Sequence, residues 1–289
     1  MNTDKYNFPP VTLVLIAVFL WSTGGLFIKL TTLDAYQVTF FRSLFAAVTV
    51  LLLTRKDGLK IDGFGILTSV IYALLLFLFV WATKKTTAAN AIFLQYTAPI
   101  YILILAPFVI GEKFHFRDLV TVVVVLAGMS LFFVGQLRLE DYQGNIAALG
   151  SGVLLGLYIM LLRHPRAEGF NPVIAVIYGN FLLALVNAPR GISAIPTMTA
   201  MDWFAVSFLG IVQIGISYIL FVKGVRRGTR PLDASLIGFI EPLLNPVWVF
   251  IFVGERPSRW ALLGGAIIIT AIALHSIRQY AGKRPLAAA

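Results

Sequence analysis

The sequence predicts an all-α integral membrane protein in which ten transmembrane helices form two inverted five-helix repeats around a central cavity. The first observation is composition: of 289 residues, 59% are hydrophobic and 12% are charged, and ordinary globular proteins carry about twice that share of charge. The second is that the apolar residues gather in runs of about 20, the length that crosses ~30 Å of hydrocarbon. The third is a pair of motifs that recur at the same spacing in both halves of the chain.

The apolar runs can be marked in order along the chain, and each predicts one helix. They cover residues 10–30, 35–54, 64–83, 88–110, 118–134, 144–162, 172–187, 203–222, 231–253 and 261–277. Together they leave too little chain for a soluble domain, and the longest connector is predicted at residues 189–201. The first run lacks the short apolar core and small-residue cleavage site of a signal peptide, so we expect it to remain in the mature protein.

The basic residues predict how the chain is oriented in the membrane. The formal net charge is +10, and nearly all Lys and Arg residues lie in the short connectors between apolar runs. This distribution is typical of membrane orientation, so we expect membrane lipids as partners and no nucleic acid. The side that holds both termini is the richer in Lys and Arg. The N and C termini are therefore predicted to be cytoplasmic.

Two segments, one in each half, share a pattern that predicts an internal repeat. Gly111-Glu112 follows Pro99 at the same distance as Gly254-Glu255 follows Pro242. The chain is therefore predicted to form two five-helix units in a single bundle, residues 1–138 and residues 139–289. Because five is odd, the second unit enters the membrane from the opposite side. Two such halves can exchange conformations around a site at the bilayer midplane, which favours transport by alternating access.

These landmarks resemble those of the EamA family of the drug/metabolite transporter superfamily. The resemblance covers essentially the whole chain and is carried by Trp21 with Lys29, Arg42, the stretch from Pro99 to Gly111-Glu112 and the stretch from Glu241-Pro242 to Gly254-Glu255. The first copy departs from the second because Ala98 stands where the second has Glu241. The resemblance implies a ten-helix secondary carrier in the bacterial cytoplasmic membrane that exports amino acids or other small metabolites. It also implies that helices one, three, four, six, eight and nine surround the cavity.

Glu241 is the sharpest candidate for a functional side chain. It lies near the middle of its predicted span, where a carboxylate must be paired, protonated or hydrated, and Pro99 and Pro242 are predicted to break their helices. Helical spacing places small and polar residues on one stripe that is expected to face the cavity: Ala234, Gly238, Glu241 and Asn245. One hypothesis is that Glu241 binds a substrate amine or carries a coupling proton. The alternative is that it pairs permanently with Arg42 or caps a neighbouring helix.

Arg42 is the one basic residue well inside a predicted span. A guanidinium group there could bind a substrate carboxylate through two hydrogen bonds. The competing interpretation is a structural clamp onto Glu241 or onto carbonyl groups. The structural interpretation is favoured, because the resemblance places helix two outside the ring of helices around the cavity.

Five further residues are candidates for substrate contacts: Trp21, Gln95, Tyr96, Gln213 and Ser217. Trp21 and Tyr96 lie on helices one and four, which line the cavity if the resemblance holds, and Gln95 would stand on the wall opposite Glu241. An aromatic wall beside Glu241 would suit an organic cation or an apolar side chain. The alternatives are packing for the aromatic residues and interhelical hydrogen bonding for Gln213 and Ser217.

Several function classes lack their sequence signatures. The chain has no cysteine and no GxxxxGKS or GxxxxGKT phosphate-binding loop. His115, His164 and His275 are far apart near span ends, without metal-ligand spacing, and each is expected at the membrane interface. We therefore expect no cofactor, no metal and no enzymatic activity.

Gly152 and Gly156 form a GxxxG pattern, and Gly264-Gly265 stand in the last span. These small residues predict close packing between helices, and a homodimer contact could use the same surfaces.

Three hypotheses of function follow from these features. The leading one is a proton-coupled or facilitated exporter of small metabolites, with amino acids as the first candidates. The second is a carrier for organic cations or drug-like amphiphiles, because Glu241 lies among aromatic residues. The third, from another class, is a membrane scaffold or accessory subunit whose polar midplane residues only set the register of the helices.

Overall fold

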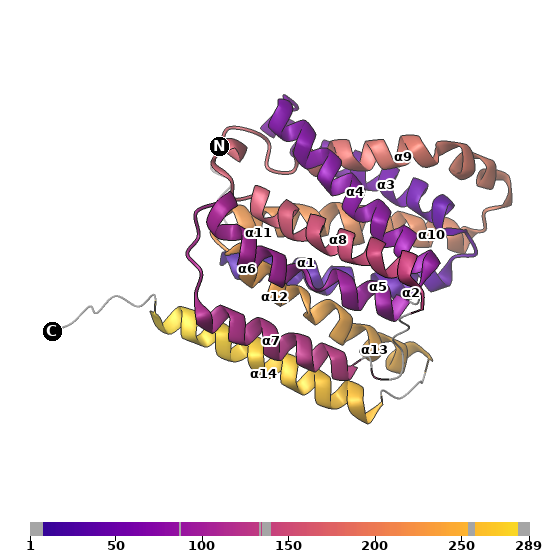
Figure 1. Cartoon of the computed structure of the whole chain (residues 1–289). Coiled ribbons are helices and arrows are strands. Elements are labelled where there is room, and N and C mark those ends of the chain that lie inside the picture. Colours follow the sequence, from indigo (N-terminus) through magenta and orange to yellow (C-terminus); the bar gives the residue numbers. More distant parts are fainter. Residues whose placement is uncertain (1–7, 87, 133, 135–139, 254–257, 283–289) are drawn as a thin grey trace.

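The computed structural model describes residues 8–86, 88–132, 134, 140–253 and 258–282, and within these ranges it contains helices and no strands (Figure 1). Eight helical stretches among the described residues are long and apolar enough to cross a membrane. The all-helical fold is therefore confirmed. The count of ten spans and the inverted repeat stay predictions. The predicted boundary between the two units, at residues 138 and 139, lies outside the described residues.

The first half of the chain forms seven helices. Their bounds are α1 Pro10–Ser22, α2 Gly24–Leu30, α3 Ala35–Thr54, α4 Gly63–Lys85, α5 Ala88–Gln95, α6 Ala98–Val109 and α7 Phe116–Phe132. Helix α3 has the bounds predicted from its apolar run. It begins there because the Asp34 side chain accepts hydrogen bonds from the backbone N–H groups of Tyr36 and Gln37, while the Gln37 side chain caps the backbone of Asp34.

The second half forms seven more α-helices and one π-helical turn. Their bounds are α8 Tyr142–Leu161, α9 Ile174–Ala194, α10 Ala200–Phe208, the π-helix η4 Leu209–Ile216, α11 Ser217–Arg226, α12 Pro231–Gly238, α13 Ile240–Val253 and α14 Arg259–Gly282. The connector predicted at residues 189–201 was wrong in its first part, because α9 continues through Pro189 to Ala194. Gly191 explains the continuation: a Cβ there would stand 2.1 Å from the Phe40 ring, so α9 packs tightly on α3 at this point.

Two predicted spans are interrupted just before their prolines. Helix α5 ends at Gln95 and α6 starts at Ala98, and helix α12 ends at Gly238 and α13 starts at Ile240. Proline lacks the N–H that would bond to the carbonyl four residues earlier, and its ring clashes with that carbonyl. Those carbonyls belong to Gln95 for Pro99 and to Gly238 for Pro242, which matches the ends of α5 and α12. The second interruption divides the four residues of the expected stripe between two helices, with Ala234 and Gly238 on α12 and Glu241 and Asn245 on α13.

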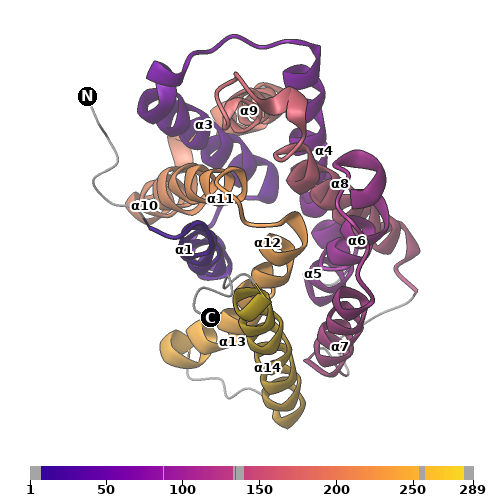
Figure 2. The ribbon, with the colours of Figure 1, turned by 90° about the vertical axis from the view of Figure 1, so that its left-hand side faces the viewer.

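Pairs of helices from the two halves pack together throughout the bundle. Helix α3 packs on α9, α4 on α8, α7 on α14 and α1 on α11. In Figure 2, α3 and α9 lie at one edge of the bundle, α7 and α14 lie at the opposite edge, and α1, α6, α8, α11 and α12 lie between them. The GxxxG pattern is used inside the chain, because added Cβ atoms at Gly152 and Gly156 would stand 2.8 Å from Gln95 O and 3.2 Å from Ala98 O.

Candidate functional site

The two helix interruptions meet at a hydrogen bond in the centre of the bundle. Tyr96 follows the end of α5, and Glu241 lies in the first turn of α13. The Tyr96 hydroxyl donates a 2.8 Å hydrogen bond to Oε2 of Glu241. The Tyr96 ring also packs edge-on against Phe239 at 5.0 Å, and a Cβ on Gly238 would stand 3.3 Å from it. The tyrosine is buried, whereas Glu241 as a residue is half-buried.

The start of α13 suits a carboxylate at this position. The first N–H groups of a helix have no partner within the helix, and the helix dipole places partial positive charge at that end. Glu241 lies in this first turn. Interrupting the span therefore puts a favourable electrostatic environment where a continuous helix would offer none. The same interruption leaves the Gly238 carbonyl without the bond that Pro242 cannot donate.

Three further tyrosines, Tyr72, Tyr158 and Tyr218, form a cluster beside this pair. The Tyr72 ring lies 5.1 Å from the Tyr218 ring and 5.2 Å from the Tyr158 ring. The Asn180 side chain donates a 3.1 Å hydrogen bond to the Tyr72 hydroxyl, while the buried Tyr158 hydroxyl has no partner. The cluster therefore carries polar groups from α4, α8, α9 and α11 into the apolar core.

Arg42 joins the tyrosine cluster rather than Glu241. Its guanidinium group interacts electrostatically with Tyr72 and Tyr218, and Glu241 interacts with Tyr218 from its own side. Both charged residues are among those described, and no ion pair within 4.0 Å joins them. The alternative in which Arg42 clamps Glu241 is therefore wrong for this conformation. Arg42, like Glu241, keeps part of its side chain accessible.

Trp21 and Gln213 add unpartnered polar atoms next to the cluster. The Trp21 ring packs 4.8 Å from the rings of Tyr218 and Phe221. Gln213, on the π-helical turn, donates from Nε2 to the backbone oxygen of Trp21 at 3.3 Å. Trp21 Nε1 and Gln213 Oε1 are buried and have no hydrogen-bond partner in the protein. Such orphaned atoms are costly, and a bound polar ligand would supply both missing partners.

The remaining candidates from the sequence are engaged elsewhere or lie outside the description. Gln95 donates a 2.7 Å hydrogen bond to Ser151 on α8, and the Ser217 hydroxyl donates to the backbone oxygen of Gln213 in the preceding turn. The Gln95 bond joins two helices, whereas the Ser217 bond lies within its own helical run and is not the interhelical bond of the alternative. The side chain of Asn245 lies outside the described part of the structure. Within that part, no group of three or more His, Cys, Asp or Glu residues could hold a metal ion.

Four members of the site, Tyr72, Tyr158, Asn180 and Tyr218, were not among the candidates from the sequence. Tyr158 and Asn180 sit in spans six and seven without a motif around them. An amide in an apolar span is itself a signal, because a buried amide needs partners. No sequence signal points to Tyr158, whose neighbours are apolar, and only the packing of α8 on α4 brings it to Tyr72.

Comparison with known proteins decides the family. The model of the EamA-like transporter family matches this chain twice, over residues 9–134 and residues 142–277. The chain belongs to the EamA-like transporter family. This EamA-like protein is therefore an integral membrane transporter rather than an enzyme.

Individual relatives of this EamA-like protein are distant, and their alignments cover from about 70% to more than 90% of each sequence. The pseudopaline exporter CntI of Pseudomonas aeruginosa is 23% identical over 90% of this chain and 93% of its own length. The "Probable terminal-alkyne amino-acid exporter" of Streptantibioticus cattleyicolor is 22% identical over 71% of this chain and 69% of its own length. A solved crystal structure superposes with a TM-score of 0.79 at 20% identity, over 93% of this chain and 97% of that one, and shows that the fold is shared.

Proposed function

We propose that this protein is a secondary active exporter of small zwitterionic metabolites, with amino acids as the first candidates, working by alternating access. The observation that carries the proposal is the placement of Glu241 and Arg42. They are two partly accessible groups of opposite charge, not paired with each other, and both interact with Tyr218. A zwitterion would neutralise both, with its ammonium at Glu241 and its carboxylate at Arg42.

Several findings support the transport part of the proposal. The family model matches the two halves of the chain separately, as a duplicated unit would. An inverted arrangement of those halves would place the interrupted spans α5–α6 and α12–α13 opposite each other at the membrane midplane. The hydrogen bond between Tyr96 and Glu241 joins these two spans. Two relatives are named as exporters, one of them of an amino acid.

Glu241 is also the candidate for proton coupling. A carboxylate at this depth binds a proton readily once its countercharge leaves. Release of the substrate amine would remove that countercharge. Proton binding at Glu241 would thus alternate with binding of the amine.

We further propose that the protein lies in a bacterial cytoplasmic membrane with both termini on the cytoplasmic side, because the connectors on that side hold most of the basic residues.

A second candidate function is the transport of organic cations. It is favoured by the aromatic ring of Tyr96 beside the Glu241 carboxylate, since a cation over such a ring gains attraction from its face. The two candidate functions differ in the role that they give to Arg42. A cation without a carboxylate gains nothing from a guanidinium group, and is repelled by it.

Counterflow in proteoliposomes separates the candidates. The substrates are a mixture of radiolabelled amino acids, with the methyl esters and decarboxylated amines of the same compounds as matched probes. We expect saturable counterflow of amino acids that Arg42→Gln abolishes and that Glu241→Gln also abolishes. Equal flux of amines in the wild type and in Arg42→Gln would favour the organic-cation function. The absence of saturable flux for every probe would overturn the transport proposal.

A further inference from the structure

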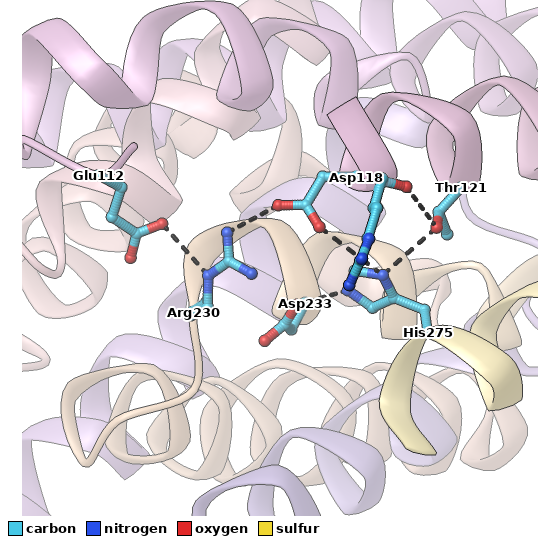
Figure 3. Close-up of polar contacts among 7 residues, drawn as sticks. Glu112, Asp118, Thr121, Arg230, Asp233 and His275 are labelled. Carbon is cyan, nitrogen blue, oxygen red and sulfur yellow. Dashed lines mark hydrogen bonds and ion pairs between the residues drawn. The ribbon is translucent and has the colours of Figure 1, made fainter. Parts of the chain in front are cut away.

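A second polar site lies at the end of the bundle where α7, α12 and α14 meet (Figure 3). We name it the terminal polar cluster. It comprises Glu112, Asp118, Thr121, Arg230, Asp233 and His275. Glu112, Asp118 and Thr121 belong to the first half of the chain, and the other three to the second half. None of these six residues belongs to the proposed binding site, although Arg230 and Asp233 precede Glu241 by 11 and 8 residues.

Arg230 bridges the two halves directly. It precedes α12, and its Nη2 donates a 2.9 Å hydrogen bond to Oδ2 of Asp118 in the first turn of α7. Its Nε lies 3.6 Å from Oε2 of Glu112, the acid of the first Gly-Glu landmark. Burial lowers the pKa of Arg230, but the hydrogen bond to Asp118 and the nearby carboxylates more than offset this and raise it above its ordinary value. The guanidinium group is therefore charged.

His275 forms a second bridge from α14. Its Nε2 lies 2.9 Å from Oδ1 of Asp233 on α12, and its Nδ1 lies 3.3 Å from the Thr121 hydroxyl and 3.9 Å from Oδ1 of Asp118 on α7. The side chain is only 7% exposed. The ring is turned inward because its helix packs along α7, and the position of His275 at the membrane interface stays a prediction.

The helices around the terminal polar cluster are packed to different extents, and this difference determines which of them can separate. Helix α7 packs on α14 along its length. Helix α12 packs mainly on α1, α6 and α8, and makes little contact with α14. Its attachment to the α7–α14 pair is carried largely by the charged contacts of Arg230 and Asp233. These pairs are largely buried, with side-chain exposures of 23% for Arg230, 8% for Asp118 and 7% for His275, so they are strong while the helices are together and are replaced by water only when the helices separate.

The two interrupted spans, α5–α6 and α12–α13, pack on each other at one end of the bundle more than at the other. On the side of the terminal polar cluster, α6 packs against α12. The other halves of the same spans, α5 and α13, do not pack on each other to a comparable extent within the described residues. The bundle is therefore closed at the end that carries the cluster. By the distribution of basic residues, this is the predicted cytoplasmic end.

We propose that the terminal polar cluster is a lock, in which Arg230 and His275 hold α12 to the α7–α14 pair and keep the predicted cytoplasmic end shut. The inference rests on the proposed alternating-access function and adds to it the contacts that must break before substrate enters from that side. Opening separates Arg230 from Asp118 and Glu112, and Asp233 from His275. The freed charges become hydrated, and closing restores the pairs. Such a bistable contact fits a switch between two packed states.

The absence of cysteine from the sequence makes accessibility labelling a direct test. Ser235→Cys places a thiol on α12 near the closed end, where Ser235 is buried. Thr97→Cys places one beside Tyr96, where Thr97 is partly accessible. Each single-cysteine protein is reconstituted in liposomes and labelled with N-ethylmaleimide, with and without Arg230→Gln. We expect Arg230→Gln to raise the labelling rate of Ser235→Cys about tenfold, because a partly buried charge pair is lost, and to lower that of Thr97→Cys.

The controls separate a lock from a loosened protein. Arg226→Gln removes a neighbouring arginine that donates to the backbone oxygen of Ala167 at 2.7 Å and bridges no acid of the cluster, so neither reporter should change. The charge exchange Arg230→Asp with Asp118→Arg should return labelling of Ser235→Cys toward the wild-type rate. Asp233→Asn, which removes the acid that contacts His275 and also attracts Arg230, should act in the same direction as Arg230→Gln and serves if that variant does not fold.

Two outcomes would overturn the lock. One is unchanged labelling of Ser235→Cys in both Arg230→Gln and Asp233→Asn. The other is a rise at both reporters, which would mean general loosening rather than a shift from one open end to the other. The readout needs no substrate, so it stays separate from the transport assay. If labelling changes in opposite directions at the two reporters but no probe shows saturable flux, the lock stands and the proposed transport function is wrong. If saturable flux is found but labelling does not change, the transport function stands and the lock is wrong.

Discussion

The Tyr96 hydroxyl and the Glu241 carboxylate lie 2.8 Å apart and join the two interrupted spans of the bundle. Each residue stands beside a break that precedes a proline, and the two breaks come from opposite halves of the chain. The contact therefore couples the halves at a single point. A ligand that competes for Glu241 must change this contact, so its binding and the relative position of the halves are linked.

Tyr96→Phe tests the role of this hydrogen bond. The variant keeps the ring that packs on Phe239 and removes only the donor to Glu241. If the bond orients the carboxylate toward the substrate, affinity should fall about tenfold, the usual worth of a hydrogen bond to a charged group. The measurement is the ligand concentration that gives half-maximal thermal stabilisation of the purified protein. Tyr101→Phe, one turn farther along α6, is the control and should bind as the wild type does.

Trp21→Phe tests whether the orphaned indole N–H serves the ligand. The smaller ring keeps aromatic packing on Tyr218 and Phe221 but removes a buried donor that has no partner. We expect substrate affinity to fall while the melting temperature without ligand changes little. Trp248→Phe is the matched control, because Trp248 Nε1 donates a 3.0 Å hydrogen bond to Ser22. That variant should lose stability instead, and the reverse pattern would contradict the assignment.

Asp202→Asn should destabilise the end of the bundle that holds α2 and α10. The Asp202 side chain is fully buried and accepts hydrogen bonds from Thr31, Thr32 and Thr199, including the backbone N–H groups of Thr32 and Thr199. An amide would turn one acceptor into a donor facing other donors, at a cost of about 1–3 kcal/mol. The melting temperature in detergent measures the loss. Asp57→Asn, at an exposed position, should leave it unchanged.

Gly152→Ala tests the close approach of α8 to α5. Its added methyl group would stand 2.8 Å from the backbone oxygen of Gln95, which cannot move without shifting the end of α5. Overpacking of this kind costs about 1–3 kcal/mol. Gly63→Ala is the control, since a Cβ there meets nothing within 4 Å. Equal melting temperatures for both variants would mean that α5 is free to move away from α8, and would argue against a fixed position for Tyr96.

Much of the fold could be predicted from the sequence because membrane spans are defined by local composition. Helix α3 matches its apolar run at both ends, since Asp34 supplies the cap that starts it. The end of α9 could not be predicted, because Pro189 is a local signal for a break while the contact of Gly191 with Phe40 is a tertiary one. The wide turn at η4 is likewise absent from any local pattern. Its Gly210 packs so closely on α3 that a Cβ would stand 2.4 Å from Phe45.

The candidate site also combines residues that the sequence identified with contacts that only the structure shows. Glu241 was identifiable because a carboxylate in an apolar run is costly wherever it lies. Its hydrogen-bond partner was not, since charge suggested Arg42 and Tyr96 was expected only as part of an aromatic wall beside Glu241, whereas the structure pairs Tyr96 with Glu241. Gln95 and Ser217 were chosen for their polarity. In the structure Gln95 forms a hydrogen bond between helices, and Ser217 forms one within its own helical run.

The sequence by itself determined that this protein lies in a membrane, where α3 begins and ends, and that two prolines interrupt matching spans, because hydrophobic length, caps and missing N–H groups act through near neighbours. Only the tertiary structure decided that Arg42 faces tyrosines instead of Glu241, that His275 is buried between Asp118 and Asp233, and that one end of the bundle is closed. Those outcomes depend on which surfaces of distant helices meet, and that is fixed by the packing of the whole bundle.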